Sequence, residues 1–298
     1  MTRPIQPHRL FALFPVIFAA AFLTPLDAQT TLVSDDFNNG TPQGSALTGT
    51  QVETSSSGSP TYNLSNSGGD PFYYDNRNTT EWFAVPQAST SSASNSIEIV
   101  DLPSTGVLEL TATFVTTTQF SGGLAGSFIG LTNQAAPGFL NNIGSSDNHL
   151  RLRFVPQNSN TGSNNNDKIG RIQYAAYDPT SGLQRAFTTG SVAAGLSDEI
   201  ELSVAYDLDT LDVTFSATNL TQGGSISSTV TLGQAISLDY AQFDLTGLGS
   251  AATASGDTRP GFDDFEVTGI PEPSAYAAVI GALGLCFALS RRRRRRIV

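Results

Sequence analysis

Few side chains in this 298-residue chain are suited to acid, base or nucleophilic chemistry. Between residues 29 and 270 there is one His (His149) and one Lys, and there is no Cys or Met. This excludes a disulfide framework, a zinc cluster built on Cys and His, and a Cys nucleophile from that span. His149 begins a strand-like run, and no G-x-S-x-G motif accompanies it. We therefore interpret it as a structural histidine at a strand edge and expect no Ser-His-Asp site.

One pair of carboxylates has the spacing of an acid and base couple. Glu199 and Glu201 are two residues apart, so on a strand they lie on the same side, about 7 Å apart. That distance is near the separations found in glycosidases. The run Glu199-Ile200-Glu201 resembles the start of the strand motif of family-16-type glucanases, but the second acid is Glu rather than Asp and no further Glu follows. We expect a solvated strand face, with a glycoside hydrolase or lyase as the alternative.

Two further acidic pairs stand near the ends of the same span, at residues 35–36 and 263–264. Calcium prefers carboxylate and backbone oxygens, which adjacent terminal strands could supply without histidine. Because side chains alternate along a strand, one Asp of each pair can face a shared site. Asp36 and Asp264 are the predicted Ca²⁺ ligands. The alternative is an acidic strand edge that resists edge-to-edge pairing.

The elements that must position these groups are predicted to be strands. Apolar residues alternate with polar ones from Leu108 to Phe114, and no sustained helical period appears between residues 29 and 270. Two polar tracts, Ser89–Ser96 and Asn158–Asp167, are predicted loops. The other predicted strands are Thr31–Phe37, Phe72–Tyr74, Trp82–Val85, Ile97–Val100, Phe128–Leu131, Leu150–Val155, Ile169–Tyr177, Ile200–Tyr206, Leu211–Phe215, Ile226–Leu232, Tyr240–Leu245 and Phe262–Val267. Such a series predicts an all-β, antiparallel jelly-roll or sandwich domain over residues 29–270.

A hairpin in the second half of the chain carries a resemblance. In residues 199–219 a strand ends at Tyr206, and residues 207–210 form a four-residue turn before the next strand. This pattern resembles a central hairpin of the concanavalin-like or laminin-G-like sandwiches, whose first and last strands commonly pair. The resemblance implies a lectin-like fold. Exposed aromatic residues are then the predicted polysaccharide-binding groups, namely Tyr62, Phe72, Tyr73, Tyr74 and Trp82.

Charge is distributed unevenly along the sequence. The formal net charge is −11, and residues 29–270 carry 7 Lys and Arg against 24 Asp and Glu. Phosphate binding depends on clustered Lys and Arg, so nucleic acid is excluded as an expected partner of this span.

Both ends of the chain have the composition of targeting signals. Residues 1–28 place the basic residues Arg3, His8 and Arg9 before an apolar run from Leu10 to Leu23, which predicts a cleaved secretory signal peptide. Residues 274–290 are uncharged and, as a helix, would span about 25 Å. The six arginines that follow would keep that end in the cytoplasm.

The C-terminal region, residues 271–298, resembles the PEP-CTERM sorting signal of Gram-negative bacteria. The three parts of that signal stand in order, as the triplet Pro271, Glu272, Pro273, the predicted single transmembrane helix, and a cluster that includes Arg291, Arg292 and Arg293. The resemblance implies processing by an exosortase-type membrane protease and passage through the inner membrane to the cell surface or medium. A permanent tail anchor is the alternative.

Together these features predict an exported, non-catalytic protein of the cell surface or extracellular matrix. Its expected role is structural or adhesive, with polysaccharide as the predicted partner. A hydrolase or lyase of the concanavalin-like fold and a purely structural matrix component remain the alternatives.

Overall fold

The computed structural model describes residues 29–38, 42–64, 72–76, 82–86, 92–115, 126–135, 147–158, 168–188, 190–195, 197–246 and 260–270. The predicted leader, the predicted sorting signal and residues 159–167 of the second polar tract lie outside these ranges. Among the described residues, no helix is long and apolar enough to cross a membrane. Every strand pairing in this part of the chain is antiparallel, which confirms the predicted all-β antiparallel class.

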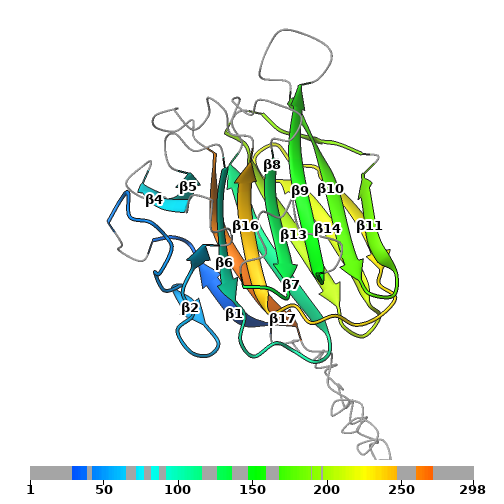
Figure 1. Ribbon diagram of the computed structural model, residues 1–298. Coiled ribbons are helices and arrows are strands. Elements are labelled where there is room, and N and C mark those ends of the chain that lie inside the picture. Colours follow the sequence, from blue (N-terminus) through cyan, green and yellow to red (C-terminus); the bar gives the residue numbers. More distant parts are fainter. Residues whose placement is uncertain are drawn as a thin grey trace, which may run out of the picture. The chain divides into compact units, whose positions relative to one another are not determined.

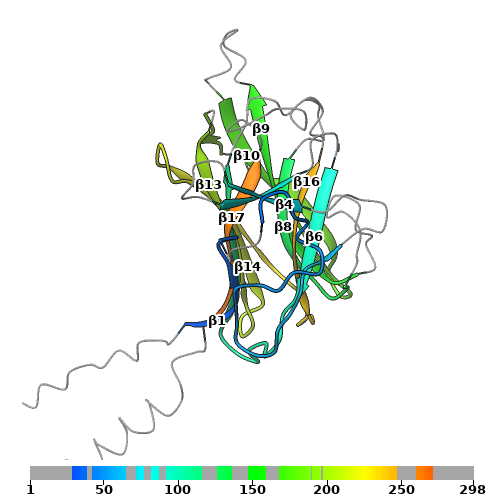
Figure 2. The ribbon, with the colours of Figure 1, turned by 90° about the vertical axis from the view of Figure 1, so that its left-hand side faces the viewer.

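The strands form two sheets, which lie one behind the other in Figure 1 and are seen from the side in Figure 2. The nine-stranded sheet has the order β15 (Ser225–Thr231), β14 (Asp212–Asn219), β13 (Glu199–Asp207), β7 (Val107–Val115), β17 (Gly261–Ile270), β1 (Thr30–Asp35) and β2 (Thr54–Ser55), with β5 (Trp82–Pro86) also paired to β17 and β4 (Phe72–Asn76) paired to β5. The eight-stranded sheet has the order β11 (Gly182–Phe187), β10 (Lys168–Asp178), β9 (His149–Asn158), β8 (Gly126–Thr132), β16 (Tyr240–Thr246), β6 (Ser92–Glu98) and β3 (Asn63–Leu64), with β12 (Val192–Ala193) paired to β10.

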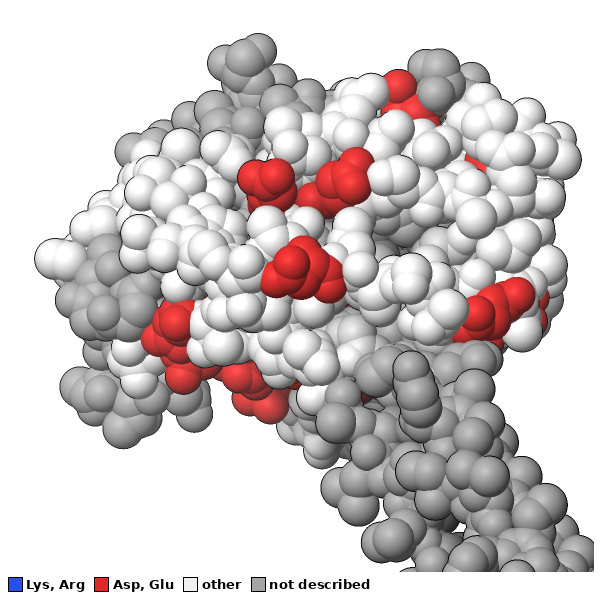
Figure 3. All heavy atoms as spheres, turned by 90° about the horizontal axis from the view of Figure 1, so that it is seen from below, with Lys and Arg blue, Asp and Glu red and all other residues white. Residues whose placement is uncertain are grey.

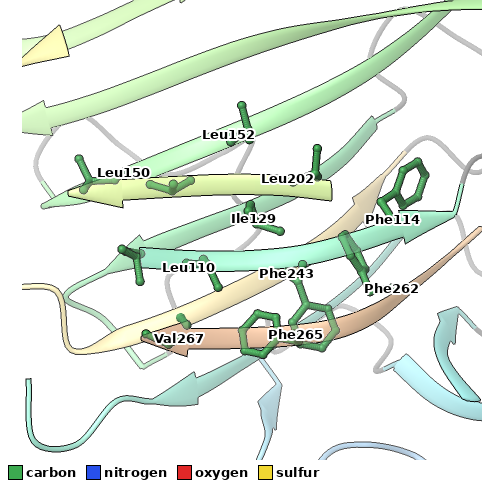
Figure 4. Packing of buried hydrophobic residues seen from close by; sticks show 14 of the residues in the cluster. Leu110, Phe114, Ile129, Leu150, Leu152, Leu202, Phe243, Phe262, Phe265 and Val267 are labelled. Carbon is green, nitrogen blue, oxygen red and sulfur yellow. The ribbon is translucent and has the colours of Figure 1, made fainter. Parts of the chain in front are cut away.

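Strand alternation builds the core between the two sheets. In β7 the residues Leu108, Leu110, Ala112 and Phe114 are buried, while the residues between them face outward. Leu150 and Leu152 of β9 and Ile129 of β8 approach from the opposite sheet, as Figure 4 shows. A fully buried Leu, Val or Phe side chain contributes about 1.5–3 kcal/mol relative to the exposed state, so this interleaved layer is the main source of stability.

An irregularity in β17 adds aromatic residues to the core. The register with β7 shifts between Asp263 and Glu266, and Asp264 adopts a left-handed φ of 46°. A bulge of this kind changes the alternation. As a result Phe262 and Phe265, three residues apart, both point into the core, where their rings lie 5.4 and 5.0 Å from the ring of Phe243.

The first and last described strands pair, as predicted. Thr30 lies opposite Gly269, and Asp35 lies opposite Phe265. The predicted hairpin is also present, because β13 pairs with β14 and the Asp207 carboxylate accepts hydrogen bonds from the N–H groups of Asp209 and Thr210, at 2.9 Å each. These N–H groups, that of Thr210 first, lower the pKa of Asp207.

The predicted loop at Ser89–Ser96 is wrong from Ser92 onward, because β6 begins there. Ser94, Asn95 and Ser96 are fully buried. Their polar atoms have partners, since the Asn95 Oδ1 accepts a hydrogen bond from the Phe72 N–H at 2.8 Å and the Ser96 hydroxyl donates to the Ala135 carbonyl at 2.8 Å. Satisfied hydrogen bonds replace the apolar contacts that a strand usually supplies, so the tract can be buried despite its polarity.

Candidate functional site

The outer surface of the eight-stranded sheet carries a regular grid of side chains over β9, β10 and β11. Residues directly opposite one another on antiparallel strands project from the same face. The register places Arg151 opposite Ala175, and Ala175 opposite Arg185. We call this surface the arginine face. The outward side chains that define it are His149, Arg151, Arg153, Arg171, Gln173, Tyr177, Leu183, Arg185 and Phe187.

The core dictates which residues of β9 belong to this surface. Leu150, Leu152 and Phe154 are fully buried among the apolar residues of the core. Because the side-chain period of a strand is two, the residues between them must project from the other side of the sheet. A glycine on β8 makes room for one of them, since a Cβ at Gly126 would lie 2.9 Å from the Nε of Arg153.

Exposure increases across the arginine face from β9 to β11. Arg151 is 4% exposed and Arg153 is 8% exposed, whereas Arg171 and Arg185 are exposed. Two large apolar side chains flank Arg185 on the same edge strand, with Leu183 at 42% and Phe187 at 50% exposure. The face therefore combines exposed guanidinium groups with an exposed aromatic ring. Arg153 lies over the Phe128 ring at 5.3 Å and donates to the Gln173 amide oxygen at 3.4 Å.

The charges of this face act on one another. Burial, followed by the charge of Arg185, lowers the pKa of Arg151 to about 10, and the same two causes lower the pKa of Arg153. Burial and then the charge of Arg151 lower the pKa of His149 to about 4. Arg151 is thus charged at neutral pH, while the His149 ring is neutral and stacks on Tyr177 with centroids 6.0 Å apart.

The same outer surface continues onto β16 and β6 as a buried polar network. Ser94, Gln242 and Asp244 are fully buried. The Gln242 amide donates to Asp244 at 2.8 Å and to the Ser94 hydroxyl at 3.2 Å, and that hydroxyl donates to Asp244. Burying polar groups is costly unless they are hydrogen-bonded, as these three are. They lie on the outer side of the sheet, so they do not contribute to the core between the two sheets.

A second candidate site is an acidic pocket beside β1 and β17. It is a hollow of about 260 Å³ lined by Ser34, Asp35, Asp36, Glu53, Asp264, Phe265 and Glu266. The structure therefore brings Asp36 and Asp264 to one site, as predicted, and adds Glu53, which the sequence analysis missed. One carboxylate oxygen from each of Asp35, Asp36 and Glu53 lies within 4.8 Å of the others. Glu53 immediately precedes the two-residue strand β2, and so short a strand gave no alternation to detect.

Burial and mutual repulsion make this acidic pocket attract protons or cations. Burial raises the pKa of Asp35 to about 6, although its carboxylate accepts hydrogen bonds from the Phe37 N–H at 2.6 Å and the Tyr62 hydroxyl at 3.1 Å. Burial and then neighbouring carboxylates raise the pKa of Glu53 to about 7, and burial and then Asp36 raise the pKa of Asp264. Carboxylate oxygens are the ligands that Ca²⁺ prefers, so the donor set fits that ion. Whether calcium binds stays a prediction.

The pair Glu199 and Glu201 lies on the outer side of the nine-stranded sheet. Ile200 and Leu202 of the same strand are fully buried, whereas Glu199 is exposed and Glu201 is half-buried. Across β7 the register aligns Glu201, Thr113 and Asp263 in one row. Burial, followed by the charge of Asp264, raises the pKa of Asp263 to about 7. Asp263 can therefore hold a proton near neutral pH, a property that the sequence analysis did not assign to it.

The predicted aromatic platform is wrong for three of its five members. Tyr62, Phe72 and Tyr74 are at most 1% exposed, and their rings pack in the core around Phe37 and Phe243. Phe72 and Tyr74 are inward residues of β4, and alternation places Tyr73 between them, half-buried. The Trp82 side chain lies outside the described residues.

His149 has the predicted structural position at the start of β9. Its Nδ1 is 2.7 Å from the Asp147 carbonyl oxygen. The arginines beside it were not predicted as a site. Their signal was present, however, because the run His149–Phe154 alternates polar and apolar residues in a span with only seven Lys and Arg.

No protein-family model matches this sequence, and no curated protein matches it. Among solved structures, it is similar to a legume lectin-like domain from Entamoeba histolytica, with 13% identity, a TM-score of 0.42, and coverage of 69% of this chain and 87% of that chain. It is also similar to the basic winged bean lectin with Tn-antigen, with 10% identity, a TM-score of 0.43, and coverage of 80% and 97%. The CBM2 module of the evolved Dit of Lactobacillus casei BL23 phage J-1 gives 12% identity, a TM-score of 0.45, and coverage of 83% and 98%. At these identities and scores the likeness assigns no function, and the fold is defined by the two sheets themselves.

Proposed function

We propose that this chain is an exported, non-catalytic adhesive protein whose β-sandwich binds polysaccharide at the cell surface or in the extracellular matrix. The observation that supports it is the arginine face, where an exposed Phe187 ring stands beside exposed guanidinium groups and the Gln173 amide. Sugar recognition requires an apolar surface for the ring face and fixed polar groups for the hydroxyls. This surface supplies both on strands, which hold side chains more precisely than loops do.

Binding of the exported protein to a panel of neutral and acidic oligosaccharides tests this proposal. Phe187→Ala should weaken binding about fivefold, because stacking on a sugar removes roughly 40 Å² of apolar surface from water, or about 1 kcal/mol. Leu220→Ala is the matched control, since Leu220 is 49% exposed and lies at the end of β14, away from this face. Equal affinities for the wild type and both variants would show that sugar binds at a surface other than the arginine face. Absence of binding to every sugar would refute the proposal.

The same proposal includes sorting by the C-terminal signal. We expect the mature protein to lack residues 1–28 and, in a host with an exosortase, also the predicted helix and the arginines. Mass spectrometry of the surface fraction should then find no peptide from Tyr276 onward. An intact arginine-rich end in the inner membrane would identify the tail as a permanent anchor instead.

One observation favours the alternative of a glycoside hydrolase. Asp263, with its raised pKa, and Glu201 face the same side of the nine-stranded sheet with one strand between them, about 10 Å apart along the hydrogen-bonding direction. Inverting glycosidases hold their two carboxyl groups about 6.5–9.5 Å apart, slightly closer than this pair, and one of the two must carry a proton, as Asp263 can. Reducing-sugar release that is lost in both Asp263→Asn and Glu201→Gln would establish this function in place of the adhesive one.

A further inference from the structure

The arginines of the described residues all project from one surface of this acidic protein. Residues 29–270 contain seven Lys and Arg, and four of the seven, Arg151, Arg153, Arg171 and Arg185, project from the arginine face. The view in Figure 3, by contrast, shows several groups of acidic side chains and no Lys or Arg among its described residues. Within the described part of the chain, the arginines are therefore gathered on one surface of a strongly acidic protein.

This clustering has an electrostatic cost within the protein. Burial first, and then the charge of Arg185, lowers the pKa of both Arg151 and Arg153, and the register places these like charges on one face across β10. Arg151 and Arg185 are separated by one intervening strand, about 10 Å at the usual strand spacing. An anion that binds between such groups relieves the repulsion and gains charge-assisted hydrogen bonds.

We propose that the arginine face binds an anionic polysaccharide. Arg171 and Arg185 contact carboxylate groups of a uronic acid polymer, and the Phe187 ring packs against one of its sugar rings. This inference rests on the proposed function and specifies its ligand class. The planar guanidinium group matches the two oxygens of a carboxylate, and the two buried arginines add to the positive potential without being exposed.

A polysaccharide fits this surface better than a nucleic acid does. Duplex DNA carries one negative charge per about 1.7 Å of its axis, so its binding requires an extended basic surface. Here four arginines occupy three neighbouring strands, and the rest of the domain is strongly acidic. A uronate polymer carries a lower charge density, one carboxylate per sugar unit, and it offers apolar ring faces to Phe187.

The experiment measures binding of the exported protein to oligogalacturonate and to an uncharged cello-oligosaccharide of equal length. Arg185→Gln should weaken binding to oligogalacturonate about tenfold, the effect of one lost charge-assisted hydrogen bond. It should weaken binding to the neutral sugar much less, by about twofold, because the glutamine amide can still donate a hydrogen bond to a hydroxyl group. Added salt should weaken the wild type more than the variant, because exposed charges are screened. The matched control is Ser227→Asp on β15, an exposed position of the other sheet where the net charge changes by the same amount. It should alter the affinity less than twofold.

Three outcomes would overturn the inference, and they separate it from the proposed function. Equal binding of both sugars, insensitive to Arg185→Gln, would reject the anionic ligand and keep polysaccharide binding. Failure to bind either sugar would count against both proposals. Binding of a short DNA duplex at least as tightly as oligogalacturonate, with the same loss in Arg185→Gln, would reassign the arginine face to nucleic acid.

Discussion

Asp35→Asn tests the electrostatics of the acidic pocket, because it removes one buried charge and changes little else. The Asp35 carboxylate is 1% exposed and accepts hydrogen bonds from the Phe37 N–H and the Tyr62 hydroxyl. An asparagine has the same shape, can accept the first of these bonds through its oxygen, and can donate to the Tyr62 oxygen through its amide. We therefore expect the variant to fold as the wild type does.

The expected effect follows from the pKa of Asp35, which burial raises from 3.8 to about 6. The folded state keeps this proton up to about pH 6, whereas the unfolded chain loses it near pH 3.8. The stabilisation linked to this proton is complete below about pH 4 and is lost as the pH rises through 6. A pKa that is higher by about two in the folded state than in the unfolded chain corresponds to roughly 3 kcal/mol of folding free energy. Asp35→Asn should thus match the wild type near pH 4 and be more stable by up to roughly 3 kcal/mol at pH 8.

Thermal unfolding in chelator across pH 4–8 measures this difference. For a domain of this size, 3 kcal/mol corresponds to roughly 6–12 °C in Tm. Asp36→Asn is the control. This substitution removes one carboxylate charge from the same pocket, but Asp36 is exposed, so no buried charge is removed. If Asp35→Asn lowered the Tm equally at pH 4 and pH 8, the carboxylate would be a net stabilising group and the argument from burial would fail.

Three further results are expected. If Asp36 and Asp264 hold Ca²⁺, chelation should lower the Tm at pH 8, because an ion at about 100 times its Kd contributes roughly 2.7 kcal/mol; identical melting curves in chelator and in millimolar Ca²⁺ would exclude this site. Glu201→Gln should fold normally and leave sugar affinity unchanged, since Glu201 lies on the sheet opposite the arginine face; a change in affinity measured beside the wild type would show that the binding surface was misplaced. Gly170→Ala should lower the free energy of unfolding by at least about 2 kcal/mol, because the added Cβ would lie 1.9 Å from the Phe154 ring. Denaturant titration measures this change, and an unchanged midpoint would mean that the Phe154 ring moves aside without cost.

The sequence predicted those strands whose inner residues are apolar. β7 and β13 alternate clearly because one side packs in the core and the other contacts solvent or polar neighbours. The first five residues of β6 escaped detection because hydrogen bonds, rather than apolar contacts, stabilise residues such as Asn95, whereas its end at Ile97 and Glu98 falls within the predicted strand Ile97–Val100. β11 escaped for another reason, since an edge strand with Leu183 and Phe187 on its exposed side has no apolar face toward the core.

The candidate sites differ in the same way. The convergence of Asp36 and Asp264 could be predicted because it required only the pairing of the terminal strands. The arginine face depends on the register of β9, β10 and β11, which aligns Arg151 with Arg185 although the two residues are 34 apart in the sequence. No local pattern contains that information. Tyr62, Phe72 and Tyr74 were wrongly predicted to be exposed, because the presence of aromatic residues does not show the direction in which each ring points.

If the proposed C-terminal attachment tethers this protein, the position of β17 has a mechanical consequence. The strand lies inside its sheet, paired with β7 on one edge and β1 on the other, so a load applied at Ile270 enters an interior strand. A pull along the strand axis must shear the hydrogen bonds of both ladders together, whereas an edge strand such as β15 could be peeled away one bond at a time. The bulge at Asp264 and the rings of Phe262 and Phe265 lie within the same strand and resist its sliding toward the tether. Tension from the proposed attachment would therefore be carried by an interior strand of the sandwich rather than by an edge strand.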